Sequence, residues 1–357
     1  MDQLQQAREI IDQVDEQMAK LFQKRMQAVE QVVAYKKAHG LPVLDSGREQ
    51  QVIAKNTARL EQKELVPYYQ ELLKFEMQLS REYQKSLLRL QGPVGYPGTL
   101  GAFSHIACSR IFKGKESRAY VTFEEVFQAL EGGEISYGVI PFENSFTGEV
   151  GEVLDLLLKY NCHIQELYDL KIEQTLLGVP GARLEEIRQV YSHHQAISQC
   201  QTYLKEHSLQ AVSYPNTALA AKFVSEQGDR TLAAIASPET AEIYNLQVLA
   251  PRINTSAENT TRFIVLGQEM PQRGNRFNLL FTVSHQAGQL AKVMQIIGEM
   301  GFNLESIKSR SLKEIPWQYY FYVEIVGNLQ EERSQQLLHV LRQTCTMVKV
   351  LGTYTLD

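Results

Sequence analysis

Apolar residues in the first part of the chain recur every three or four positions, which is the spacing of one face of an α-helix. The clearest stripe consists of Leu4, Ala7, Ile11, Val14, Met18 and Leu21. Up to residue 90, glycine and proline interrupt this pattern only at Gly40, Pro42, Gly47 and Pro67. These two breaks predict three helices, and the alternating spacing of three and four on the first favours contact with a partner helix.

The pattern changes after residue 91, where short runs rich in β-branched and aromatic residues begin to alternate with helical runs. The strands predicted most clearly are 94–96, 137–140, 189–192, 231–235 and 262–266. Such alternation predicts an α/β region. It ends near residue 267, and residues 270–275, which contain proline and glycine, predict a linker.

The last segment predicts the order strand, helix, strand, strand, helix, strand. The expected elements are 277–284, 290–300, 303–311, 319–326, 331–342 and 347–355. This is the ferredoxin-like βαββαβ pattern, which domains of many functions share.

Composition and charge narrow the class of protein. With 357 residues the chain is too long for one ordinary core, and 44% hydrophobic with 22% charged residues predict a globular protein. A net charge of −5 argues against a broad nucleic-acid surface. The four cysteines are scattered, so neither a metal site nor a disulfide framework is expected. Without a signal-peptide pattern or an apolar run of about 20 residues, we expect a cytoplasmic protein with no membrane segment.

Two cations interrupt the apolar stripe of the first helix. Arg25 stands where an apolar residue is expected, and Lys36 lies eleven residues further on, close to the same azimuth at ~100° per residue. Cations facing a helical interior are costly unless an anion meets them, although a structural salt bridge or a head group that reaches water is the alternative. Asp45, Arg48 and Glu49 follow at the start of the second predicted helix, and Ser80 and Gln84, spaced i, i+4, share a face of the third.

Together with Arg8, these residues resemble the active-site pattern of AroQ-type chorismate mutase, an all-helical enzyme. The matching positions are Arg8, Arg25, Lys36, Asp45, Arg48, Glu49, Ser80 and Gln84. The resemblance implies that Arg8, Arg25 and Arg48 hold the dicarboxylate chorismate. It also implies that Lys36 and Gln84 donate to its ether oxygen. The rearrangement to prephenate needs orientation and charge stabilisation rather than a nucleophile or metal, which suits these residue types.

By the same resemblance, Glu49 with Asp45 engages the ring hydroxyl region and Ser80 supports the pocket.

The length of the first helix bears on assembly. A helix from about residue 4 to 36 is ~50 Å long, more than a unit of three helices covers. Arg8, seventeen residues before Arg25, points ~100° away from it. We therefore expect Arg8 to serve a neighbouring subunit's site in a homodimer or higher homo-oligomer, as in the family's intertwined dimer.

Polar residues in the middle segment gather at the ends of predicted strands, where open α/β sheets place ligands. The glycine-rich loop before Ser104 lacks the dinucleotide spacing and instead suits a carboxylate. For His193, the alternative to a site role is a helix start capped by Ser192 with the histidine partly exposed.

These motifs resemble prephenate dehydratase over roughly residues 93–267. The resemblance rests on the loop 98–104, Glu143-Asn144-Ser145, Ser192-His193 with Gln195, and Thr261-Arg262-Phe263. It implies two lobes around a cleft and conversion of prephenate to phenylpyruvate, water and carbon dioxide. Thr261 is implied as the acid, Arg262 as an electrostatic clamp, and Ser104, Asn144 and Ser145 as orienting groups. The other implied substrate-binding positions are Glu143, Ser192, His193, Gln195 and Phe263.

The βαββαβ segment resembles an ACT domain, a binder of small molecules such as amino acids. The family's phenylalanine motifs, Gly-Ala-Leu and Glu-Ser-Arg-Pro, read here as Gly288-Gln289-Leu290 and Lys308-Ser309-Arg310-Ser311. The implied effector-binding residues are Gly288, Gln289, Leu290, Ser309 and Arg310. The chain departs from the pattern at Gln289 and at Lys308, which reverses a charge. We expect feedback inhibition by phenylalanine, with a domain that only dimerises as the alternative.

The three resemblances, in this order, imply a bifunctional chorismate mutase and prephenate dehydratase with a regulatory domain. We expect a three-helix mutase domain over 1–91, a two-lobed α/β dehydratase domain over 92–268 and a ferredoxin-like ACT domain over 277–357. Chorismate and prephenate are the expected substrates, and no metal or organic cofactor is implied. Two other hypotheses remain: a monofunctional dehydratase with a mutase-like binding module, and a non-enzymatic amino-acid sensor.

Overall fold

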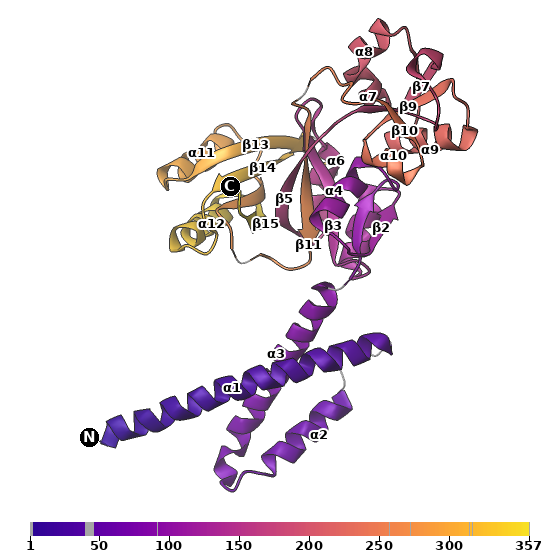
Figure 1. Cartoon of the computed structure of the whole chain (residues 1–357). Helices are drawn as coiled ribbons and strands as arrows, with labels where there is room; N and C mark the ends of the chain where they lie inside the picture. Colours follow the sequence, from indigo (N-terminus) through magenta and orange to yellow (C-terminus); the bar gives the residue numbers. More distant parts are fainter. Residues whose placement is uncertain are drawn as a thin grey trace. The chain divides into compact units, whose positions relative to one another are not determined.

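A computed structural model describes residues 3–39, 46–90, 92–256, 258–271, 273–313, 315 and 317–356. The chain divides into two compact units, Met1–Gly92 and Pro93–Asp357, which are coloured indigo to purple and purple to yellow in Figure 1.

The first unit consists of three helices, as the apolar spacing predicted. They are α1 (Gln3–Ala38), α2 (Ser46–Thr57) and α3 (Val66–Leu90), with the 3-10 turn η1 (Lys63–Leu65) before α3. α3 packs against both α1 and α2. The buried apolar residues of this unit are few and include Val33, Leu73 and Met77. Most of the α1 stripe is exposed, from 47% at Val14 to 65% at Leu21, so a single copy of the unit leaves this face uncovered.

The strands of the first lobe of the second unit form one end of a long mixed sheet. These strands are β1 (Val94–Pro97), β2 (Ser117–Tyr120), β3 (Tyr137–Asn144), β4 (Gly148–Glu149), β5 (His163–Lys171) and β11 (Thr260–Gly267). The helices of this lobe are α4 (Phe103–Ile111), α5 (Phe123–Glu131) and α6 (Gly151–Lys159). The chain returns to this lobe through β11, which lies between β3 and β5 and pairs antiparallel with both.

The second lobe is a separate sheet of five strands in the order β10-β6-β9-β7-β8. The strands are β6 (Thr175–Gly178), β7 (Gln189–Ser192), β8 (Gln210–Ser213), β9 (Leu232–Ala236) and β10 (Gln247–Ala250), and the 3-10 turn η2 (Leu184–Glu186) precedes β7. The helices are α7 (His194–Gln199), α8 (Gln201–Glu206), α9 (Thr217–Gln227) and α10 (Glu239–Ile243). The strands expected at 94–96, 137–140, 189–192, 231–235 and 262–266 are confirmed as β1, β3, β7, β9 and β11.

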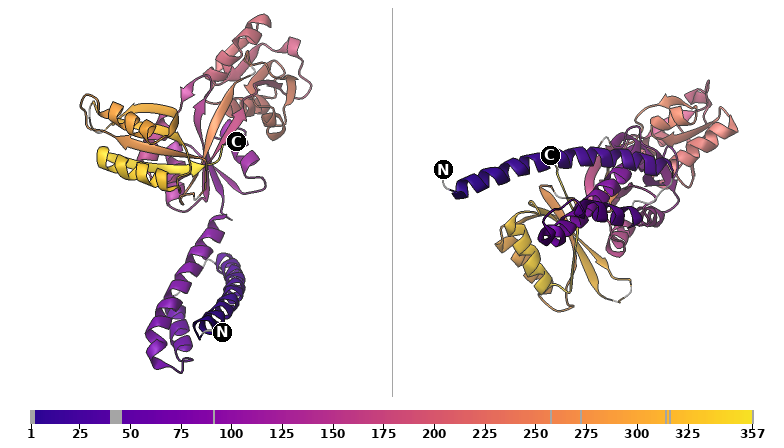
Figure 2. Two further views of the ribbon diagram at one scale, coloured as in Figure 1. Left: turned by 90° about the vertical axis from the view of Figure 1, so that its left-hand side faces the viewer. Right: turned by 90° about the horizontal axis from the view of Figure 1, so that it is seen from below.

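The C-terminal segment has the predicted βαββαβ order. Its elements are β12 (Arg276–Thr282), α11 (Gln289–Glu299), β13 (Asn303–Ser311), β14 (Tyr319–Val326), α12 (Glu332–Thr344) and β15 (Met347–Tyr354). The four strands form an antiparallel sheet in the order β13-β14-β12-β15. α11 and α12 cover one face of it, as Figure 2 shows, over a core that includes Phe277, Phe281 and Leu337.

This C-terminal sheet continues into the sheet of the first lobe. β15 pairs with β5 at a single position, Gly352 opposite Ile164. A β-carbon at Gly352 would lie against the backbone of Ile164, so glycine permits this close approach. The face of the C-terminal sheet away from α11 and α12 packs on α6, where Leu280, Tyr320 and Tyr322 join the core of the first lobe.

Within the described residues, no helix is long and apolar enough to cross a membrane. The same residues contain no group of three or more histidine, cysteine, aspartate or glutamate side chains that could hold a metal ion.

Candidate active sites

Arg25 lies at the contact between α1 and α3 in the first unit. Its guanidinium donates to the hydroxyl of Ser80 and forms an ion pair with Glu76, at 3.3 Å from Nε to Oε1. Ser80 in turn donates to the backbone oxygen of Glu76 at 2.8 Å. The unusual cation in the apolar stripe therefore meets polar partners on the neighbouring helix. The structure brings together Arg25 and Ser80, two of the predicted mutase residues.

The other mutase residues are distributed over the same three helices. Glu49, near the start of α2, forms an ion pair with Arg81 of α3, a residue that sequence reasoning missed. Gln84 is buried on α3, and its Oε1 has no hydrogen-bond partner within the described part of the chain. Such an orphaned acceptor is costly, and it favours a hydrogen-bond donor beside this oxygen. Lys36 is partly buried.

Arg8 and Arg48 are exposed on α1 and α2, respectively. Asp45, for which a substrate contact was predicted, lies outside the described residues. The exposure of Arg8 in a single copy agrees with the expectation that it serves another subunit. Its role stays a prediction.

In the second unit, Asn144 and Thr261 form the best-defined polar pair among the predicted residues. They lie opposite each other on β3 and β11, and Asn144 Nδ2 donates to Thr261 Oγ1 at 2.9 Å. The Oδ1 atom of Asn144 accepts from the backbone N–H groups of Phe146 and Thr147 at 2.9 and 3.1 Å. These two donors fix the orientation of the amide, so Thr261 must accept from it. The hydroxyl proton of Thr261 is then free to be donated elsewhere.

Ser145 and Asn259 complete this cluster. Ser145 Oγ accepts from the N–H of Thr260 at 3.0 Å, which ties the end of β3 to the start of β11. Asn259 is almost fully buried, and its Oδ1 accepts from Asn144 Nδ2 at 2.9 Å. Its own Nδ2 has no partner among the described atoms. Asn259 was visible in the sequence as part of a polar cluster before Thr261, but nothing distinguished it from its neighbours.

A cavity of about 280 Å³ borders on Asn259. It is lined by Phe146, Ser198, Gln199, Gln201, Thr202, Asn254, Thr255, Ser256 and Asn259. The lining combines the turn after β3 in the first lobe with α7 and α8 in the second lobe. This cavity between the lobes therefore borders the cluster that contains the Asn144–Thr261 pair.

Ser104 is the second residue of α4, whose N-terminal N–H groups follow the glycine-rich loop. The loop is tied to the second lobe, because the Tyr244 hydroxyl donates to Leu100 O at 2.7 Å and Thr240 Oγ1 donates to Gly101 O at 3.2 Å. A second cavity, of about 290 Å³, lies beside α4 and α10 and has Phe103 and Arg110 in its wall.

The predicted residues of the second lobe, Ser192, His193 and Gln195, differ from one another in burial and in hydrogen bonding. Ser192 is fully buried and donates to Ile235 O at 2.7 Å, so it joins β7 to β9. His193 itself caps α7, with its side chain accepting from the N–H of Gln195, so the alternative that Ser192 is the cap is wrong. Burial, together with the neighbouring His194, lowers the pKa of His193. Gln195 is exposed.

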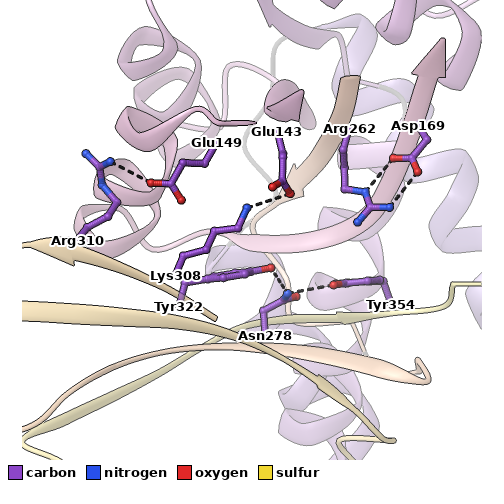
Figure 3. Close-up of polar contacts among 9 residues, drawn as sticks. All are labelled: Glu143, Glu149, Asp169, Arg262, Asn278, Lys308, Arg310, Tyr322 and Tyr354. Carbon is purple, nitrogen blue, oxygen red and sulfur yellow. Dashed lines mark hydrogen bonds and ion pairs between the residues drawn. The ribbon is translucent and has the colours of Figure 1, made fainter. Parts of the chain in front are cut away.

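Glu143 and Arg262 point toward the C-terminal segment (Figure 3). Glu143 pairs with Lys308 at 2.9 Å. Arg262 makes two hydrogen bonds to Asp169, at 2.8 and 2.9 Å. These bonds to Asp169 are the main reason that the pKa of Arg262 is raised. On the opposite side of β11, Phe263 is buried in the core.

The predicted effector residues are spread over two places. Gly288 caps α11 in a left-handed conformation with φ of 83°, and Leu290 lines a cavity of about 140 Å³. Gln289, the first residue of α11, is partly buried. Ser309 and Arg310 lie on β13, where Ser309 is exposed and Arg310 binds Asp155 through Nε and Nη2 at 3.0 Å each.

Asp155 was missed, although the sequence contained a signal for it. It stands within an apolar run on α6, among Val153, Leu154, Leu156 and Leu157, all of which are buried. An acid in such a run must find partners, because an unpaired buried carboxylate is costly. Asp169, by contrast, lies within β5, a strand of mixed polarity, and gave no such signal.

Comparison with known proteins adds independent findings. A family model described as prephenate dehydratase matches residues 94–271, and one described as chorismate mutase type II matches residues 7–85. A bifunctional chorismate mutase/prephenate dehydratase of Aquifex aeolicus is 30% identical, with the alignment covering 99% of this chain and 98% of that protein.

Two solved structures share the fold of the second unit. One, described as a novel type of quorum quenching acylase, is 27% identical with a TM-score of 0.70, over 74% of this chain and 98% of that one. The other is a prephenate dehydratase from Arthrobacter aurescens in complex with L-Phe, 24% identical with a TM-score of 0.69, over 74% of this chain and 90% of that one.

Proposed function

Because the chain belongs to the bifunctional chorismate mutase/prephenate dehydratase family, we propose that its two compact units divide two consecutive reactions between them. The protein rearranges chorismate to prephenate and converts prephenate to phenylpyruvate. The mutase match lies within the first unit and the dehydratase match within the second. The product of one unit is thus the substrate of the other.

The mutase site is assigned to the α1–α3 contact around Arg25 and Gln84. Arg25 and Arg48 supply cations for the two carboxylates together with Arg8, and Lys36 and the Gln84 amide donate to the ether oxygen as negative charge develops there. The exposed apolar face of α1 supports a homodimer. In that dimer Arg8 of each subunit reaches the other subunit's site.

The dehydratase site is assigned to the Asn144–Thr261 pair, and the hydrogen bond between them carries this assignment. Because Asn144 occupies a lone pair of the Thr261 oxygen, the Thr261 proton points to the substrate. It is donated to the departing hydroxyl, which leaves as water, and a proton from solvent restores the Thr261 hydroxyl. The ring–carboxylate bond breaks at the same time, its electron pair completes the aromatic ring, and carbon dioxide is released. Ser104 and Ser145 orient the substrate.

Substitution of Thr261 tests the dehydratase assignment. Thr261→Ala is expected to abolish phenylpyruvate formation and to leave chorismate consumption unchanged, whereas Thr261→Ser retains dehydratase activity. Near-native dehydratase rates in Thr261→Ala would refute the assigned acid. Equal loss of both activities would instead indicate misfolding.

A coupled assay separates the three hypotheses raised by the sequence. Formation of phenylpyruvate from chorismate supports the bifunctional enzyme. Formation from prephenate alone supports a monofunctional dehydratase, and no product from either substrate supports a sensor.

For the C-terminal segment we propose an ACT domain that binds phenylalanine as a feedback inhibitor. The support is its βαββαβ fold and the retained Gly288, Leu290, Ser309 and Arg310. Titration of both activities with phenylalanine, tyrosine and tryptophan tests this. No response to phenylalanine would leave a domain that only dimerises.

The four free cysteines fit the reducing cytoplasm, where we place the enzyme.

A further inference from the structure

The two strands that carry the dehydratase motifs present different residues on their two faces. On β3 and β11, Thr261 lies opposite Asn144 and Arg262 lies opposite Glu143. Successive side chains of a strand point to opposite faces of the sheet. The Asn144–Thr261 pair and the Glu143–Arg262 pair therefore lie on opposite faces.

The hydrophobic cores on the two sides confirm this division. Phe263 and Val265, which alternate in phase with Thr261, pack with Val94 and Tyr96 in the core beneath α4. Ile264 and Leu266, in phase with Arg262, belong to the core that contains Tyr320 and Tyr322 of β14. Glu143 thus lies on the side of the sheet that meets the C-terminal segment.

A nearly buried cation from that segment meets Glu143. The Nζ atom of Lys308, on β13, lies 2.9 Å from Glu143 Oε2 and 5.0 Å from the centre of the Phe142 ring. The Lys308 side chain is only 12% exposed. A cation held this far from water depends on its counter-ion, so the pair fixes the position of both partners.

A second cation on β13, Arg310, contacts β4, which forms a hairpin with β3. β3 and β4 pair through Glu143 with Glu149 and through Asn144 with Gly148. Arg310, two residues after Lys308 and therefore on the same face of β13, lies 3.5 Å from Glu149. Figure 3 shows Lys308 beside Glu143 and Arg310 beside Glu149.

We propose that Lys308 is a positioning residue for the dehydratase reaction. Through Glu143 it holds the β3–β4 hairpin, and so keeps the neighbouring Asn144 in hydrogen-bonding distance of Thr261. Glu143 then acts on the reaction through the protein rather than by touching the substrate. This inference rests on the assignment of Thr261 as the proton donor.

A double-mutant cycle tests the coupling in the full-length chain. Lys308→Met and Glu143→Gln should each lower kcat for prephenate by about tenfold, with KM changed less than about twofold, because misplacement affects chemistry more than binding. The double variant should lose no more than the worse single variant. Lys308→Arg should retain activity, since it keeps the charge. Lys292→Met, at an exposed lysine of α11, is the matched control and should match the wild type.

Hydrogen exchange supplies a readout that does not depend on catalysis. The amides of Phe146 and Thr147, which donate to Asn144 Oδ1, should exchange faster in Lys308→Met and at the wild-type rate in Lys292→Met.

If the fold-losses in kcat of the two single variants multiplied in the double variant, Glu143 would contact the substrate independently of Lys308. That result would overturn the proposal. So would a rise in KM alone, or unchanged exchange at these amides. If Thr261→Ala kept its activity while Lys308→Met still loosened the hairpin, the assigned acid would be wrong and the structural coupling would stand.

Discussion

Asp155 adds polar contacts to the hydrophobic packing between α6 and the C-terminal sheet. Its two oxygens accept two hydrogen bonds of 3.0 Å from Arg310 and one of 2.6 Å from the Tyr320 hydroxyl. Lys313 Nζ lies 3.0 Å away. The Asp155 side chain is 17% exposed, so solvent screens these contacts only in part.

These contacts lower the pKa of Asp155. Burial alone would raise it, but the hydrogen bonds from Arg310, Tyr320 and Lys313 lower the pKa from 3.8 to about 2. At 1.36 kcal/mol for each pKa unit, this difference corresponds to about 2 kcal/mol of stability. Because the folded-state pKa is the lower one, the stabilisation is complete above pH ~4 and is lost as the pH falls toward 2.

We therefore expect Asp155→Asn to lower the free energy of unfolding of the second unit by about 2 kcal/mol at pH 7. Urea unfolding of the full chain measures this, with hydrogen exchange of residues 151–159 as the local probe. The difference in free energy of unfolding between wild type and variant should become smaller below pH ~4, since the wild type then loses the same interaction. Glu116→Gln, which breaks an exposed pair with Arg118, is the control and should cost less than about 1 kcal/mol. A loss at Asp155 no larger than this control, or a difference that grows in acid, would refute the argument.

Three further predictions concern a glycine beside Arg310, a buried thiol and the mutase site. A β-carbon at Gly151 would overlap the Arg310 guanidinium, so Gly151→Ala should lower the melting temperature of the otherwise wild-type protein. In an Arg310→Ala background the same substitution should raise the melting temperature, because only the better helix propensity of alanine remains. A change of the same sign in both backgrounds would contradict this contact. Burial raises the pKa of the Cys162 thiol to about 12, so iodoacetamide at pH 8 should label it only after denaturation, and rapid labelling of the native protein would show an opening at this site. Mutase activity should not require acid, because the amide of Gln84 donates without being protonated; a steep loss between mildly acidic and neutral pH would argue against its role.

Much of the local structure was predictable from the chain alone. The three N-terminal helices, the alternating α/β elements and the βαββαβ order all followed from hydrophobic periodicity and from the positions of glycine and proline. These signals are local, because each longer helix or strand carries its own period. The polar cluster around Asn144 and Thr261 was also visible, since both residues lie at strand ends.

The partners of those residues were decided only by the tertiary structure. The alternation of a strand places Glu143 and Asn144 on opposite faces, but it did not indicate which segments would cover each face, because that depends on how β3 is packed. Nor did it indicate that Lys308 would meet Glu143, or Asp155 meet Arg310, across more than 150 residues. The sequence by itself determined the elements and the residue types available for chemistry. The tertiary structure decided which charges meet, because contacts between distant segments depend on packing and strand register, which no local period encodes.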